Sequence, residues 1–98
     1  MMVEMRTYTL VPGGGAEYLR IYNESARALQ TRILGRLAGL YQSETGELNQ
    51  LVFLWAYESL DERARRRAVL AADAGFAAFR KSVRHLLVRQ ESRILAQA

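Results

Sequence analysis

The feature that most constrains the fold of this chain is a nearly uninterrupted apolar run over residues 49–57. Every residue from Leu51 to Tyr57 is hydrophobic, which predicts a β-strand that is buried on both faces. Side chains alternate between the two faces of a strand. One face would carry Leu51, Phe53, Trp55 and Tyr57, and the other Val52, Leu54 and Ala56. Both faces of this strand therefore need a cover.

The rest of the pattern places this strand in a small α+β domain that spans residues 1–98. Period-two alternation predicts a strand over 2–11, and we expect further strands over 37–43 and 86–95, although the last segment could also be helical. Helical spacing predicts one helix over about 16–34, and a capping box at Ser59 and Glu62 starts a second helical region. That region runs to about residue 72, is interrupted at 73–75 and continues to about 83. The order β-α-β-β-α-β predicts a ferredoxin-like fold, with a four-stranded antiparallel sheet and two helices on one face.

Two helices cover only one face of such a sheet, so the apolar run also predicts a partner. Leaving either set of side chains exposed would create a large apolar patch, which is unusual on a monomer. Two copies of the chain with their sheets face to face would bury it around a two-fold axis. We therefore expect a homodimer.

Composition excludes several kinds of site. The chain has no cysteine, which rules out disulfides, zinc–thiolate sites and cysteine nucleophiles. The single histidine, His85, cannot form a multi-histidine metal site within one chain, and its place after the last helix favours a surface role. We expect no metal and no cofactor. A haem protein would be coloured and would use His85 as an axial ligand.

Charge and patterning also bear on partners and location. The net charge of +4 is modest, and Arg63, Arg65, Arg66 and Arg67 lack the interleaved aromatic residues of a nucleic-acid surface. We interpret this cluster as a solvated helix face and expect no nucleic acid. No apolar run is long enough to span a membrane. The N-terminal residues include Glu4 and Arg6 where a signal peptide would be apolar, so we expect a cytoplasmic protein. Predominance of arginine over lysine suggests a bacterial source.

Glu4, Arg6 and Tyr8 are the candidate catalytic residues, because they alternate along one face of the first strand. The Arg6 guanidinium could bind an anionic group, and Glu4 could act as a base if burial raised its pKa. The alternative is an ion pair that fixes strand register and dimer pairing. An open cavity of a few hundred Å³ lined by Glu4 and Arg6 would favour a binding or catalytic function.

Candidate ligand-binding residues lie on the second and third strands and on the hairpin between them. Tyr41, Trp55 and Tyr57 are aromatic residues of the kind that line pockets, although packing in a core or interface is the alternative. Glu44 and Asn49 lie near the hairpin, where Asn49 could instead cap the turn backbone.

Several blocks of the chain resemble the NIPSNAP family. These are Glu4-Met5-Arg6-Thr7-Tyr8-Thr9-Leu10 followed by Pro12-Gly13, Gly39-Leu40-Tyr41, Ser43-Glu44-Thr45-Gly46-Glu47-Leu48-Asn49-Gln50, Leu54-Trp55-Ala56-Tyr57-Glu58-Ser59-Leu60 with Arg63, and Gln90-Glu91-Ser92-Arg93-Ile94-Leu95. The match covers essentially the whole chain. One departure is Phe76, which stands where the family usually has tryptophan and which lacks the indole N–H.

The resemblance implies a dimeric α+β barrel, in which two ferredoxin-like units pack their sheets together. It implies no established reaction. We therefore expect a homodimeric domain that binds a small organic ligand in or near the barrel. A cofactor-independent monooxygenase or isomerase-like enzyme, acting on an aromatic or polyketide-like substrate, is the alternative. A structural or regulatory dimer is the third possibility.

Overall fold

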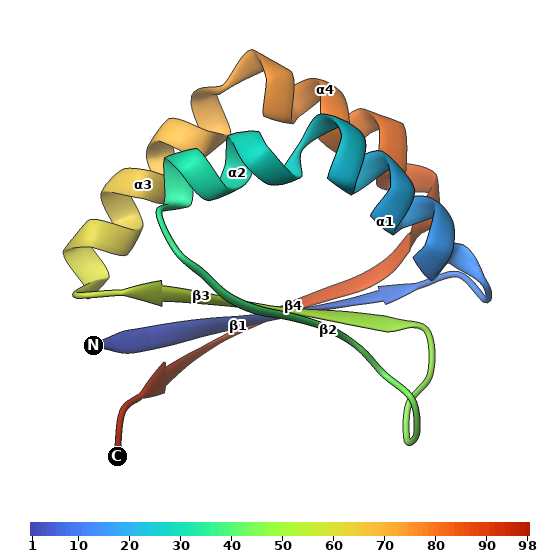
Figure 1. Ribbon diagram of the computed structural model, residues 1–98, viewed down its shortest axis with the longest axis horizontal. Coiled ribbons are helices and arrows are strands. Elements are labelled where there is room, and N and C mark those ends of the chain that lie inside the picture. The colour runs from blue at the N-terminus through green and yellow to red at the C-terminus, as the bar shows by residue number, and fades with distance from the viewer.

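The computed structural model describes all 98 residues and contains the four-stranded antiparallel sheet that the sequence predicts (Figure 1). The strands, in the spatial order β2-β3-β1-β4, are β1 (Met2–Leu10), β2 (Leu37–Gln42), β3 (Gln50–Tyr57) and β4 (Leu87–Ala96). This strand order, with all helices above one face, confirms the ferredoxin-like α+β fold. None of the helices is long and apolar enough to cross a membrane.

The helical layer differs in one respect from the expected pair of helices. The first helical region is divided into α1 (Gly14–Ser25) and α2 (Arg27–Leu34), because Ala26 leaves the helical conformation with φ −134°. The Ser25 hydroxyl donates to the Ile21 carbonyl at 2.7 Å, a contact that often bends helices. The prediction of one continuous helix over 16–34 was therefore wrong at this position.

The second helical region is divided where the sequence predicts. It comprises α3 (Leu60–Ala72), α4 (Ala74–Val83) and the short 3-10 turn η1 (Arg84–Leu86). The Ser59 hydroxyl accepts a hydrogen bond from the Glu62 amide at 3.1 Å, which confirms the capping role expected there. Asp73 caps α4 in the same way, accepting from the Phe76 amide at 2.8 Å.

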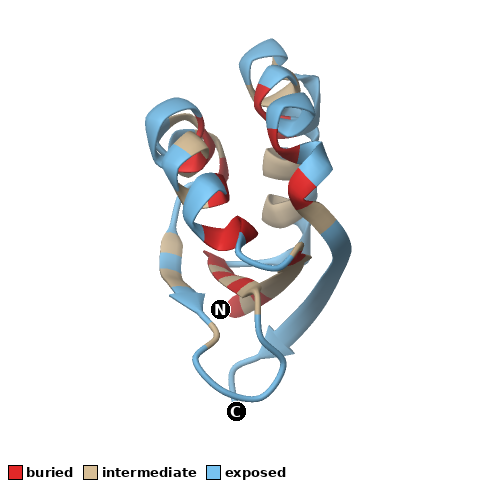
Figure 2. Ribbon diagram, turned by 90° about the vertical axis from the view of Figure 1, so that its right-hand side faces the viewer, coloured by how far each residue is buried: buried red, intermediate tan, exposed pale blue.

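The strand register settles which side chains face the helices. Glu4 pairs with Trp55, and Arg6 with Phe53, so one face of β1 and β3 lies under the helical layer. That face carries most of the core, and buried residues concentrate between helices and sheet (Figure 2). The opposite face of these strands carries Val3, Met5, Val52, Leu54 and Ala56, and no helix covers it.

Strand β4 is an edge of the sheet and pairs only with β1. Its residues are exposed after Leu87, although the register turns Gln90, Ser92 and Ile94 to the same face as Glu4. The helices α3 and α4 therefore do not pack tightly on this strand. This incomplete cover leaves room beside β1 for the site described next.

Candidate functional site

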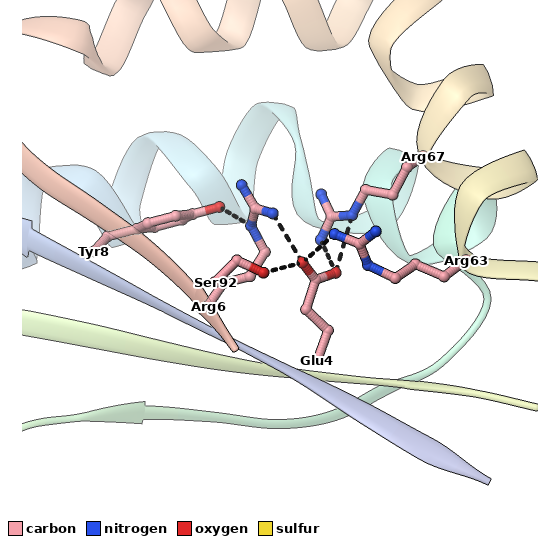
Figure 3. A network of polar contacts seen from close by, with 6 residues as sticks. All are labelled: Glu4, Arg6, Tyr8, Arg63, Arg67 and Ser92. Atoms are coloured by element: carbon pink, nitrogen blue, oxygen red, sulfur yellow. Dashed lines mark hydrogen bonds and ion pairs between the residues drawn. The ribbon is translucent and has the colours of Figure 1, made fainter. Parts of the chain in front are cut away.

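A buried carboxylate organises the polar centre of the molecule. The Glu4 side chain is 0% exposed and accepts hydrogen bonds from three arginines (Figure 3). Arg6 Nη1 lies 3.0 Å and Arg63 Nη2 2.8 Å from Oε2, and Arg67 Nε lies 3.2 Å from Oε1. The Ser92 hydroxyl also donates to Oε2. One carboxylate thus joins β1, α3 and β4.

The surroundings of Glu4 keep it ionised. Burial alone would raise its pKa, but hydrogen bonds from Arg63 and Ser92, together with the charges of Arg67 and Arg6, lower the pKa to about 2. A carboxylate with so low a pKa is a weak proton acceptor. Glu4 is therefore better suited to position the three arginines than to act as a general base.

The low pKa of Glu4 predicts an acid-sensitive contribution to stability. Its pKa falls from 4.5 to about 2 on folding, so the contribution is complete above about pH 4.5 and is lost as pH falls toward 2. The shift corresponds to about 3 kcal/mol. Urea unfolding of the wild type and Glu4→Gln at about pH 6, 4 and 3 should show a difference that shrinks with acidification. A difference independent of pH would contradict this assignment.

Arg6 and Tyr8 follow Glu4 along the same face of β1. Arg6 Nε donates to the Tyr8 hydroxyl oxygen at 3.0 Å, and the guanidinium carbon lies 5.8 Å from the Tyr8 ring centroid. Burial disfavours the charged form of Arg6, but Tyr8 and Glu4 favour it more strongly and raise its pKa. The Tyr8 oxygen is the acceptor in this contact, so its own O–H can donate to another group.

A cavity of about 750 Å³ lies between β1, β4 and the helices α3 and α4. Its volume is within the range of about 300–1,000 Å³ that is typical of small-molecule pockets. Aromatic residues in its wall are Tyr8, Tyr18, Phe76 and Phe79. Its arginines are Arg6, Arg67, Arg80, Arg84 and Arg89, and no acidic residue lines it. Arg6 and Tyr8 thus reach an open space, whereas Glu4 lies behind them.

The other candidate ligand-binding residues are not part of this cavity. Trp55 and Tyr57 lie in the core, with 0% and 2% of their surface exposed. Tyr41 is 59% exposed and shares the uncovered face with Val52, its partner on β3. Glu44 is exposed in the β2–β3 hairpin. The structure therefore brings Arg6 and Tyr8 together in one cavity but disperses these residues.

Asn49 and His85 have local contacts. Asn49 has a positive φ of 62°, and its side-chain oxygen accepts from the Gly13 amide at 3.1 Å, joining the hairpin to the turn before α1. His85 Nε2 lies 3.9 Å from Glu17 Oε1, and both side chains are well exposed. Neither residue lines the cavity.

The sequence interpretation missed two arginines of the site. The cluster on α3 was expected to be a solvated face, but Arg63 and Arg67 turn inward to Glu4. Arg66 instead pairs with Glu62 at 2.9 Å. The signal was available: Arg63 and Arg67 are four residues apart and share a helix face with Leu70, which is buried.

The fold and this site define a ferredoxin-like α+β domain with a cavity between its sheet and its helices. The NIPSNAP family model matches residues 3–98, and the chain belongs to the NIPSNAP family. It is 33% identical over 88 residues to Protein NipSnap homolog 3A of Homo sapiens, covering 89% of this chain and 36% of that protein. The chain thus spans about a third of the length of the curated relatives it matches.

Solved structures support the same assignment. A NIPSNAP family protein with unknown function from Agrobacterium tumefaciens is 39% identical, with a TM-score of 0.96, covering 100% of this chain and 88% of that one. A protein of Nitrosomonas europaea proposed to be an antibiotic biosynthesis monooxygenase has a TM-score of 0.72 at 14% identity. The match covers 99% of this chain and 98% of that one. The second likeness shows the fold alone. No reaction is established through these relatives.

Proposed function

We propose that the protein is a homodimeric domain that binds a small organic molecule in the cavity between its sheet and the helices α3 and α4. The observation that carries this proposal is the cavity itself, about 750 Å³ in volume and lined by Arg6 and Tyr8. Both polar groups are fixed by contacts behind the cavity, Arg6 to Glu4 and Tyr8 to Arg6. Fixed polar groups beside an aromatic wall are typical of a small-molecule site.

The homodimer part of the proposal rests on the uncovered face of the sheet. Val3 and Met5 on β1 lie beside Ala56 and Leu54 on β3, and the chain's own helices are on the other side. Leu95 of β4 extends the same apolar surface opposite Val3. A second copy packed against this face would bury these side chains. The cavity lies on the other side of the sheet and would stay accessible in such a dimer.

Blocking the cavity tests the binding function. Ala71 is exposed on α3 and lines the cavity, so Ala71→Trp should fill space with little disturbance of the core. Ala64→Trp is the matched control, because Ala64 is exposed on the same helix but does not line the cavity. Native mass spectrometry of freshly purified protein should detect a retained small molecule in the wild type and in Ala64→Trp, and at least about tenfold less in Ala71→Trp.

The two variants also define the outcome that would contradict the proposal. Equal retention in Ala71→Trp and Ala64→Trp would place the molecule outside this cavity. If the purified protein retains no molecule, the same two variants can be compared for binding of added aromatic probes. Failure of every probe to bind the wild type, with no difference between the two variants, would exclude the binding function.

A cofactor-independent enzyme is the second candidate, and it is favoured by the position of the Tyr8 hydroxyl. This group can donate a proton toward the cavity beside the positive charge of Arg6. Arg6 and Tyr8 would then polarise a bound carbonyl group, and Glu4 would hold Arg6 in place. Tyr8→Phe separates the two functions. If the protein is an enzyme, the wild type and Tyr8→Phe should retain different molecules, which liquid chromatography distinguishes even when the two are isomers. If it is a binding protein, both should retain the same molecule.

A further inference from the structure

We propose that the ligand of this cavity is an organic carboxylate with an apolar, ring-containing body, and that its carboxylate binds Arg6, Arg67 and Tyr8. The inference rests on the proposed binding function and specifies the chemistry of the ligand. It follows from the charge of the cavity, from the donors that remain available there, and from the position of the aromatic wall.

The charge of the cavity is strongly positive and incompletely balanced. Arg6, Arg63 and Arg67 share the single carboxylate of Glu4. Arg80 and Arg84 line the cavity and have no ion-pair partner, and Arg89 is paired with Glu47 at 3.0 Å. Since no acidic residue lines the cavity, an anionic ligand would supply the missing negative charge.

Donor groups also remain available near Glu4. Arg6 uses Nε for Tyr8 and Nη1 for Glu4, which leaves its Nη2 group without a partner. Arg67 lines the cavity and makes no hydrogen bond through Nη1, whereas its Nη2 is buried 3.1 Å from Glu4 Oε1. The Tyr8 O–H makes no hydrogen bond as a donor to other protein groups. Guanidinium groups and a hydroxyl that converge in this way suit a carboxylate, which accepts several hydrogen bonds at once.

The remaining wall suits a ring. Tyr18 and Phe79 meet edge to face with ring centroids 5.8 Å apart, and Phe76 lies 5.6 Å from Phe79. Tyr8 joins this group at 6.1 Å from Tyr18, so the aromatic wall begins at the residue that contacts Arg6. An aromatic or other flat apolar body would pack against this wall while its carboxylate reaches the arginines.

A pair of probes that differ only in the head group tests the inference. Calorimetric titration of the wild-type protein with 2-naphthoate and with neutral 2-naphthylmethanol compares the same ring with and without the charge. We expect 2-naphthoate to bind at least about tenfold more tightly, because charge-assisted hydrogen bonds are stronger than neutral ones. Arg6→Gln should lower the affinity for 2-naphthoate by about tenfold or more and change the affinity for 2-naphthylmethanol much less.

Arg32→Gln is the matched control, since Arg32 is exposed on α2 and does not line the cavity. It should leave the affinity for both probes unchanged. If Arg6→Gln does not fold, Tyr8→Phe replaces it, because that substitution leaves all contacts of Glu4 in place. The expected result is then a several-fold loss that is confined to 2-naphthoate.

The outcomes separate this inference from the function on which it rests. Equal affinity of the two probes, or no binding of 2-naphthoate, would overturn the carboxylate inference. The proposed function would survive that result if 2-naphthylmethanol or a retained neutral molecule is lost in Ala71→Trp. Equal weakening of both probes by Arg6→Gln would overturn the placement of the carboxylate at Arg6.

Discussion

Glu4→Gln is expected to lower the free energy of unfolding by about 3–5 kcal/mol, the cost typical of breaking a buried ion pair. The substitution keeps the shape of the side chain but removes the only carboxylate that Arg6, Arg63 and Arg67 share. The three guanidinium groups would then repel one another in a confined space. Chemical denaturation monitored by Trp55 fluorescence, at a pH near neutral, measures the loss.

Glu24→Gln is the control for this prediction. Glu24 pairs with Arg20 at 3.5 Å on the exposed side of α1, and exposed pairs of this kind contribute about 0–1 kcal/mol. Glu4→Gln should therefore be far more destabilising than Glu24→Gln, although both remove one negative charge. Similar losses in the two variants would mean that the Glu4 contacts do not stabilise the fold.

Leu54→Asp is expected to convert the proposed homodimer into a monomer. Leu54 lies on the uncovered face of the central strand β3, beside Met5 of β1. A two-fold dimer would bury the new carboxylate from each copy, and burying an unpaired ion costs several kcal/mol. The dissociation constant of the dimer should rise at least about 100-fold, which sedimentation equilibrium measures.

Val69→Asp is the matched control for Leu54→Asp. Val69 is 58% exposed on α3, on the opposite side of the sheet from Leu54. It should leave the dimer intact while adding the same charge. A wild-type monomer at micromolar concentration, or equal effects of the two substitutions, would contradict a dimer formed through the sheet.

The alternation of residues predicted much of the fold. Together with the apolar run over 51–57, it predicted all four strands to within one or two residues, and Leu51, Phe53, Trp55 and Tyr57 lie on one face of β3 as expected. Periodicity is effective here because each strand has a different set of neighbours on each face. The capping box at Ser59 was equally local, and its hydrogen bond is present.

The candidate site was less predictable, because it depends on contacts between distant segments. Glu4, Arg6 and Tyr8 could be placed on one face of β1, but sequence alone did not show that this face lies under the chain's own helices. The spacing of Arg63 and Arg67 puts them on the helix face of Leu70, but the sequence alone did not show that this face meets Glu4. The cavity itself depends on how loosely α3 and α4 cover β4.

The pairing of β1 with β4 has a consequence for how the protein folds. Glu4 and Ser92 contact each other although they lie 88 positions apart in the sequence, and β1 occupies an interior position in the sheet. Both hydrogen-bonding edges of β1 are therefore unpaired when it is synthesised. One edge can pair with β3, and the other waits for residues 87–96. Such long-range closure slows folding and leaves an open strand edge on the nascent chain. Early binding of that edge by a chaperone would protect the polypeptide until its last strand arrives.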